Sequence, residues 1–150
     1  MEGCVILEND DTIQLLSECD AGIKTAVASI DEIKDHIDDP DLKKIFEQYK
    51  HDHEELGRRI IDELSKYHEE GKDPNPMAKA MSWMKINTKM FNNPSAHEAA
   101  DLMMDGCNMG IKSVCKYQNK YKAANENAKT YANDLVDLEQ KLMVELRAFL

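Results

Sequence analysis

A histidine within an apolar helical pattern is the residue of this sequence most able to do chemistry. His53 lies between Tyr49 and Leu56 in a run of residues spaced alternately four and three apart. Such spacing predicts one side of a helix packed against a core. A histidine there either binds a metal or forms a hydrogen bond to a neighbouring carboxylate. We favour the hydrogen bond, because buried polar groups are usually satisfied within the protein.

Two other groups of side chains have metal-binding chemistry. Glu47 and His51 lie four residues apart on the same predicted helix but off the apolar stripe, which favours a surface pair. Cys19 and Cys107, with nearby methionines, carry the soft sulfur ligands that Cu(I) prefers. Methionine more often acts as an adaptable filler of the core. The four cysteines match no zinc motif in their spacing, and we expect reduced thiols at Cys4, Cys19, Cys107 and Cys115.

Two helical hairpins are expected to position these residues. Asp11 with Gln14 resembles a capping box, so we expect a tail over 1–10 and the first helix after Asp11. That helix ends in a turn at 38–41, and a second helix follows, completing a hairpin over 11–70. Ser95 with Glu98 forms a second capping box, which opens another hairpin over 95–150. The two hairpins form one domain over 11–150.

The segment 71–94 connects the hairpins and is expected to contain a short helix from Met77 to Phe91. The apolar residues of this helix fall on one face, at Met77, Met81, Met84 and Phe91 together with Thr88, and Trp83 lies beside them. This face either packs into the core or forms a dimer surface, since methionine and tryptophan are common at interfaces.

An internal repeat supports the paired hairpins. Cys-Asp-Ala-Gly-Ile-Lys at 19–24 recurs as Cys-Asn-Met-Gly-Ile-Lys at 107–112, near the start of the first helix of each hairpin. The chain therefore resembles a duplicated helical hairpin whose halves bury their apolar stripes against each other.

Composition restricts the class of protein. Charged residues make up 32% of the 150 residues and the net charge is −10, which repels nucleic acid and anionic lipid. No signal peptide and no apolar stretch long enough to cross a bilayer is present, so we expect a cytoplasmic protein. No P-loop, nucleophile elbow or His-Glu-x-x-His motif occurs.

The paired hairpins, the long connection and the segment from Tyr49 to Leu56 resemble the ferritin-like superfamily, and in particular uncharacterised bacterial ferritin-like families. The resemblance implies an all-α, ferritin-like four-helix bundle with a short extra helix in its crossover. Iron-binding members of the superfamily carry a Glu on each of two helices and a Glu-x-x-His on each of the other two.

The resemblance assigns candidate metal ligands position by position. His53 matches the histidine of the second helix, but Lys50 stands where a bridging glutamate is required. Glu139 and Val136 occupy the equivalent positions of the last helix. Glu18 suits the first helix, and Asp105 lies one residue from the matching position of the third. The candidate metal set is therefore Glu18, His53, Glu139 and Asp105. The carboxylate expected beside His53 is Glu18 or Glu139.

The leading interpretation is a non-catalytic bundle without a cofactor that acts through protein–protein contacts. We expect a homodimer or larger assembly, an unidentified protein partner, and neither nucleic acid nor membrane as a partner. The alternative is a divergent ferritin-like protein that binds iron or another divalent ion.

Overall fold

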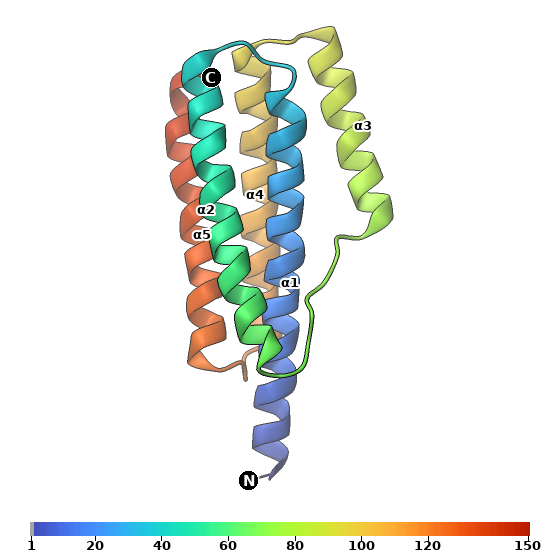
Figure 1. The fold of residues 1–150 in the computed structure, drawn as a ribbon, viewed down its shortest axis with the longest axis vertical. Coiled ribbons are helices and arrows are strands. Elements are labelled where there is room, and N and C mark those ends of the chain that lie inside the picture. Colours follow the sequence, from blue (N-terminus) through green and yellow to red (C-terminus); the bar gives the residue numbers. More distant parts are fainter. Residues whose placement is uncertain (1) are drawn as a thin grey trace.

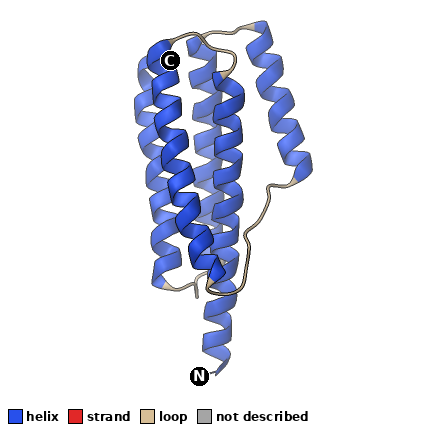
Figure 2. Ribbon diagram, in the orientation of Figure 1, coloured by secondary structure: helices blue, strands red, loops and turns tan. Residues whose placement is uncertain are grey.

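Helices are the only regular secondary structure of the residues that the computed structural model describes, 2–150, and loops join them (Figure 2). The helices are α1 (Glu2–Lys34), α2 (Pro40–Ser65), α3 (Pro76–Asn92), α4 (Ala96–Lys120) and α5 (Glu126–Leu146), with a short 3-10 turn at Arg147–Phe149. The prediction of an all-α helical bundle is confirmed, and the short crossover helix is present as α3.

Four helices form the bundle, and α3 lies outside it (Figure 1). The hairpins α1–α2 and α4–α5 pack together through α1 against α4 and α2 against α5. Each of these neighbouring pairs runs antiparallel (Figure 1). The connection from α2 travels along α1 before α3 begins, and α3 then packs on α1 and α4.

Side-chain caps define where the later helices begin. Asp39 accepts a hydrogen bond from the Leu42 amide at 3.0 Å, and Ser95 accepts one from the Glu98 amide at 3.1 Å. Each cap satisfies an amide that has no partner within its own helix. The helix start predicted at Ser95 is therefore confirmed. Asn75 and Asn125 cap α3 and α5 in the same way.

The first helix begins at Glu2, so the start predicted after Asp11 is wrong. No proline interrupts residues 2–11, and Asp11 serves another element instead. Its carboxylate accepts the Ala123 amide at 2.9 Å, and the Thr12 hydroxyl accepts the Asn125 amide at 2.8 Å. Both residues thus anchor the turn between α4 and α5. The expected tail is helical from residue 2, and Met1 lies outside the described residues.

The core consists of two apolar clusters, one toward each end of the bundle. One cluster contains Leu15, Ile60 and Leu135, and the other contains Phe46, Met90 and Leu146. His53 on α2 and Glu139 on α5 lie between the residues that each helix contributes to the two clusters, and both are buried. A polar layer therefore separates the two halves of the core.

Buried Asp20 fastens the start of the crossover to α1. Its carboxylate accepts the Lys72 amide at 2.9 Å and pairs with the Lys24 ammonium, also at 2.9 Å. Lys24 reaches on to Asp73 at 3.1 Å. Gly71 has a φ of +109° at this point, a backbone conformation that side chains disfavour. The loop therefore passes close to α1 only because residue 71 has no side chain.

We predict that Gly71→Ala lowers the free energy of unfolding by about 2 kcal/mol or more, from backbone strain and overlap. A Cβ at this position would lie 2.5 Å from an Asp20 carboxylate oxygen and 2.7 Å from Ile61. Urea unfolding of the variant measures the loss. Gly106→Ala is the control, because its Cβ would meet nothing within 4 Å. It should stabilise helix α4 by about 0.5–1 kcal/mol. A stabilising effect of both substitutions would contradict the role given to Gly71.

Candidate functional site

His53 on α2 and Glu139 on α5 form a hydrogen-bonded pair inside the bundle. The imidazole is 0% exposed, with Nε2 2.6 Å from Oε1 of Glu139. Its Nδ1 lies 2.6 Å from the carbonyl oxygen of Tyr49, one turn earlier on α2. The predicted hydrogen bond from His53 to a neighbouring carboxylate is confirmed, and Glu139 is the partner.

The two hydrogen bonds of His53 determine which of its ring nitrogens carry protons. A carbonyl oxygen only accepts, so Nδ1 of His53 must donate to Tyr49. A second proton then lies between Nε2 and the Glu139 carboxyl group. Burial lowers the pKa of His53, but the hydrogen bond and negative charge of Glu139, with the Tyr49 carbonyl, outweigh burial and raise the pKa above 6.5. The raised pKa of His53 favours the shared proton on the imidazole and therefore the ionic form of the pair.

Helix α4 closes the third side of this pair. Cys107 is 1% exposed, and its thiol pKa is raised by burial and by the charge and hydrogen bond of Glu139. The thiol therefore stays protonated beside the Glu139 carboxylate. A Cβ at Gly110 would lie 3.7 Å from the carboxyl carbon of Glu139. The carboxylate is consequently enclosed by α2, α4 and α5.

The other two candidate ligands lie elsewhere and have other partners. Glu18 pairs with Lys72 of the crossover. Asp105 is half-exposed and lies 3.7 Å from Lys85 of α3. The structure therefore brings together only two of the four predicted ligands.

A metal site also requires free ligand atoms. Both nitrogens of His53 already contact protein oxygens. Within residues 2–150, no three His, Cys, Asp or Glu side chains are grouped so that they could hold a metal ion. Binding a metal at His53 would therefore require Glu139 or the Tyr49 carbonyl to give up its hydrogen bond.

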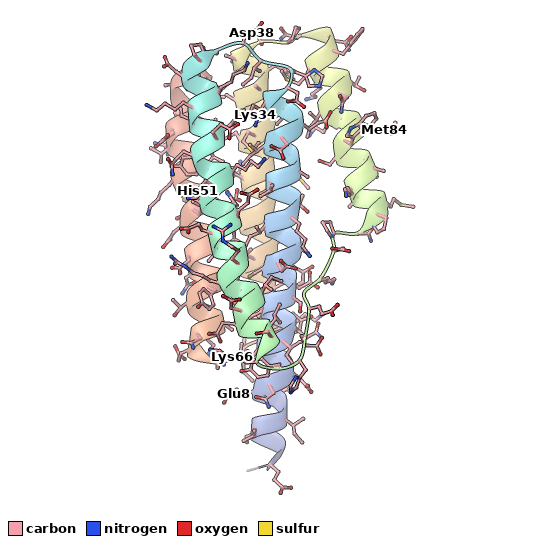
Figure 3. The ribbon with its side chains drawn as sticks, viewed as in Figure 1. Glu8, Lys34, Asp38, His51, Lys66 and Met84 are labelled. Atoms are coloured by element: carbon pink, nitrogen blue, oxygen red, sulfur yellow. The ribbon has the colours of Figure 1, made fainter. Side chains whose placement is uncertain are left out.

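The alternative metal-binding groups are separated as well. Cys19 and Cys107 lie in different clusters of the core. Burial and the charges of Glu18 and Asp20 raise the pKa of the Cys19 thiol to about 12, so the thiolate that binds soft metals is scarce at neutral pH. Glu47 pairs with Lys34, and His51 is exposed on α2 (Figure 3). Glu47 and His51 lie on the surface as predicted, but Glu47 pairs with Lys34 rather than with His51.

Two residues of the first repeat have a role that sequence reasoning missed. Asp20 and Lys24 anchor the crossover, whereas their repeat partners Asn108 and Lys112 are exposed on α4. The sequence feature that could have indicated this role is the difference between Asp20 and Asn108 at matching positions of the two repeats. An acidic residue is present only in the copy along which the crossover runs.

An exposed apolar surface lies on the outer side of α3. We call it the α3 seam, and it comprises Met77, Met81, Met84, Thr88 and Phe91. Its four apolar side chains are 61–84% exposed. Core packing, one of the two interpretations of this face, is therefore wrong. Helix α3 contacts the bundle instead through Ile86 and Met90, which are buried. Met84 points away from the bundle in Figure 3.

A groove lies between α1 and α3 beside the seam. Its volume is about 980 Å³, and its apolar walls include Ala28, Pro74, Ala80 and Trp83. The groove forms because no residue of α3 before Ile86 is buried. The first half of α3 thus stands along α1 without packing into the core.

Comparison of the chain with protein-family models, with curated proteins and with solved structures finds no match. No helix within residues 2–150 is long and apolar enough to cross a membrane.

We predict that Glu139→Gln destabilises the protein by about 3 kcal/mol at pH 6, because it leaves the buried imidazolium without its counter-charge. The raised pKa of His53 means that the stabilisation by Glu139 is complete below pH 6.5 and is lost as pH rises through the folded-state pKa. The free energies of unfolding of wild type and Glu139→Gln should therefore converge as pH rises, and urea unfolding of both proteins from pH 6 to 9 measures this.

Glu55→Gln is the control for this series. Glu55 pairs with Arg58 at 3.4 Å on the surface, so its loss should change stability by less than about 0.5 kcal/mol, with little pH dependence. A constant difference between wild type and Glu139→Gln over the whole pH range would contradict the ionic form of the buried pair.

We also predict that His53→Leu alone costs about 3–5 kcal/mol, since it leaves Glu139 buried and unpaired. Adding Glu139→Met should recover this loss, because an apolar pair of similar volume needs no counter-charge. Thermal unfolding of the single and double variants tests this. A double variant no more stable than the single one would show that the cost arises from packing rather than from an unpaired charge.

Proposed function

We propose that this protein is a non-catalytic helical bundle of ferritin-like type that acts through protein–protein contacts and assembles with itself. The exposed α3 seam is the observation that carries the proposal. Four large apolar side chains, each more than half exposed, line one face of a single helix. Contiguous apolar surface of this kind marks interaction sites in soluble proteins.

The pattern of the seam suits helix packing. Its residues are spaced alternately four and three apart, as in helices that pair side by side. Methionine adapts its shape to a partner, and exposed Trp83 lies next to the seam. The half of α3 that precedes Ile86 buries nothing, and short isolated helices are marginal in water. A partner that covers the seam would therefore stabilise α3.

The ferritin-like part of the proposal is supported by the arrangement of the chain. Two antiparallel hairpins are joined by a long crossover with its own helix. The residues at the metal-bridging positions support a role other than iron chemistry. Lys50 replaces a glutamate and pairs with Asp31 at 2.7 Å, and Val136 replaces the other glutamate. An acidic chain with a net charge of −10 also disfavours nucleic acid as the partner.

We predict that wild-type protein at micromolar concentration has a mass of at least twice 17.1 kDa, and that Met81→Glu with Met84→Glu reduces it to 17.1 kDa. Moving the charged glutamates from water into an apolar contact costs free energy, which opposes assembly. Light scattering gives the mass, and circular dichroism verifies that the exposed substitutions leave the helices intact.

Met109→Glu is the matched control, because Met109 is also exposed but lies on α4, away from the seam. It should leave the mass unchanged. A monomeric wild-type protein would refute self-assembly, and equal dissociation by Met109→Glu would move the contact off α3.

A further inference from the structure

A second exposed apolar segment occurs at the beginning of α1. Every residue from 2 to 10 is exposed, and this α1 extension projects beyond the rest of the bundle (Figure 1). Val5, Ile6 and Leu7 are 54–61% exposed. The extension contacts no other helix, so nothing within one copy covers these side chains.

The two uncovered segments carry opposite charges. The α1 extension contains Glu2, Glu8 and Asp10 and no basic residue. Helix α3 contains three lysines and no acidic residue, although the chain as a whole is strongly acidic. Lys79 makes no ion pair within the described part of the chain, and Lys85 pairs with Asp105 only at 3.7 Å. Lys89 lies 4.0 Å from Glu98 of α4. Lys79 is thus the α3 lysine that is available to an acidic partner.

The two segments do not meet within one copy. In Figure 3, Glu8 lies at the projecting end of α1, whereas Met84 lies on the outer side of α3 toward the opposite end. Both segments are helical, within α1 and α3, and both helices are packed on the bundle of their own copy. A contact between them therefore joins two copies.

We propose that the α1 extension of one copy docks on the α3 seam of a second copy, at the mouth of the α1–α3 groove. This inference rests on the proposed function, because it names the partner of the seam. Val5 and Glu8 lie three residues apart, on one side of α1. Val5 would lie against the exposed methionines, and Glu8 beside Lys79. Pairing α3 with a second α3 is less favourable, because it would bring lysines together.

The contact joins two different surfaces. Each copy offers one extension and one seam, so two copies that exchange extensions form a closed dimer, and successive contacts form a ring or a filament. The extension is about 13 Å long at 1.5 Å per residue, so one contact is small. The association should therefore depend on concentration, and it should weaken as salt screens the opposite charges.

Complementation between two defective variants tests the proposal. One variant lacks residues 2–8 and retains its seam, and the other carries Met81→Glu with Met84→Glu and retains its extension. Each should be monomeric alone, because one side of every contact is missing. Mixed in equal amounts, they should form a heterodimer with a single working contact, detected by sedimentation velocity with one variant fluorescently labelled.

The results distinguish docking of the α1 extension from self-assembly through the α3 seam. If the methionine substitutions dissociate the wild-type assembly but removal of residues 2–8 does not, the seam is the interface and the extension is not its partner. An assembly in which α3 pairs with α3 would likewise give no heterodimer in the mixture. Assembly that survives both changes would overturn both proposals.

Charge reversal gives an independent test. Lys79→Glu should weaken association by up to about fivefold for each ion pair lost. Glu8→Lys in the same chain should restore it, since reversed charges again attract. Glu126→Lys, at an exposed site at the start of α5, is the control and should not restore association. Equal effects of Glu8→Lys and Glu126→Lys would show that only net charge matters, which would contradict docking of the extension.

Discussion

The proton between His53 and Glu139 is the constraint on which the rest of the bundle depends. It lies between two apolar clusters, at the level where α2, α4 and α5 approach one another. A shift of α2 by one turn against α5 would leave an imidazole and a carboxylate buried without partners. Each unsatisfied buried group costs about 1–3 kcal/mol, and more when it is charged. Apolar clusters alone tolerate such a shift, so the polar pair selects one register of the helices.

The crossover makes the duplicated hairpins unequal. Asp20 and Lys24 hold its first residues against α1, while the corresponding face of α4 remains open to solvent. Helix α3 then returns to the bundle through two buried residues only. The same arrangement explains why the molecule has an exposed apolar helix: the loop fixes α3 near α1 at one end, and Ile86 and Met90 attach it at the other.

Much of the fold could be predicted from the sequence, because local rules decide it. The alternating spacing around His53 predicted a buried face of α2, and the Ser95 cap located the start of α4. The start of α1 was predicted wrongly at Asp11, because a capping pattern considers only neighbouring residues. The amide that Asp11 binds is that of Ala123, 112 residues away. Periodicity placed the methionines of α3 on one face but could not say whether anything covered that face. Glu18 and Asp105 lie on the expected helices, but their nearest cations, Lys72 and Lys85, come from the crossover, whose path no pattern specified.

The enclosure of His53 has a consequence for how the molecule moves. Its Nε2 proton is shielded from water by three helices, and the imidazole is 0% exposed. Exchange of that proton with solvent therefore requires the helices around His53 to open locally. The rate at which this imidazole proton exchanges with solvent, measured from its resonance, would therefore report how often the centre of the bundle opens.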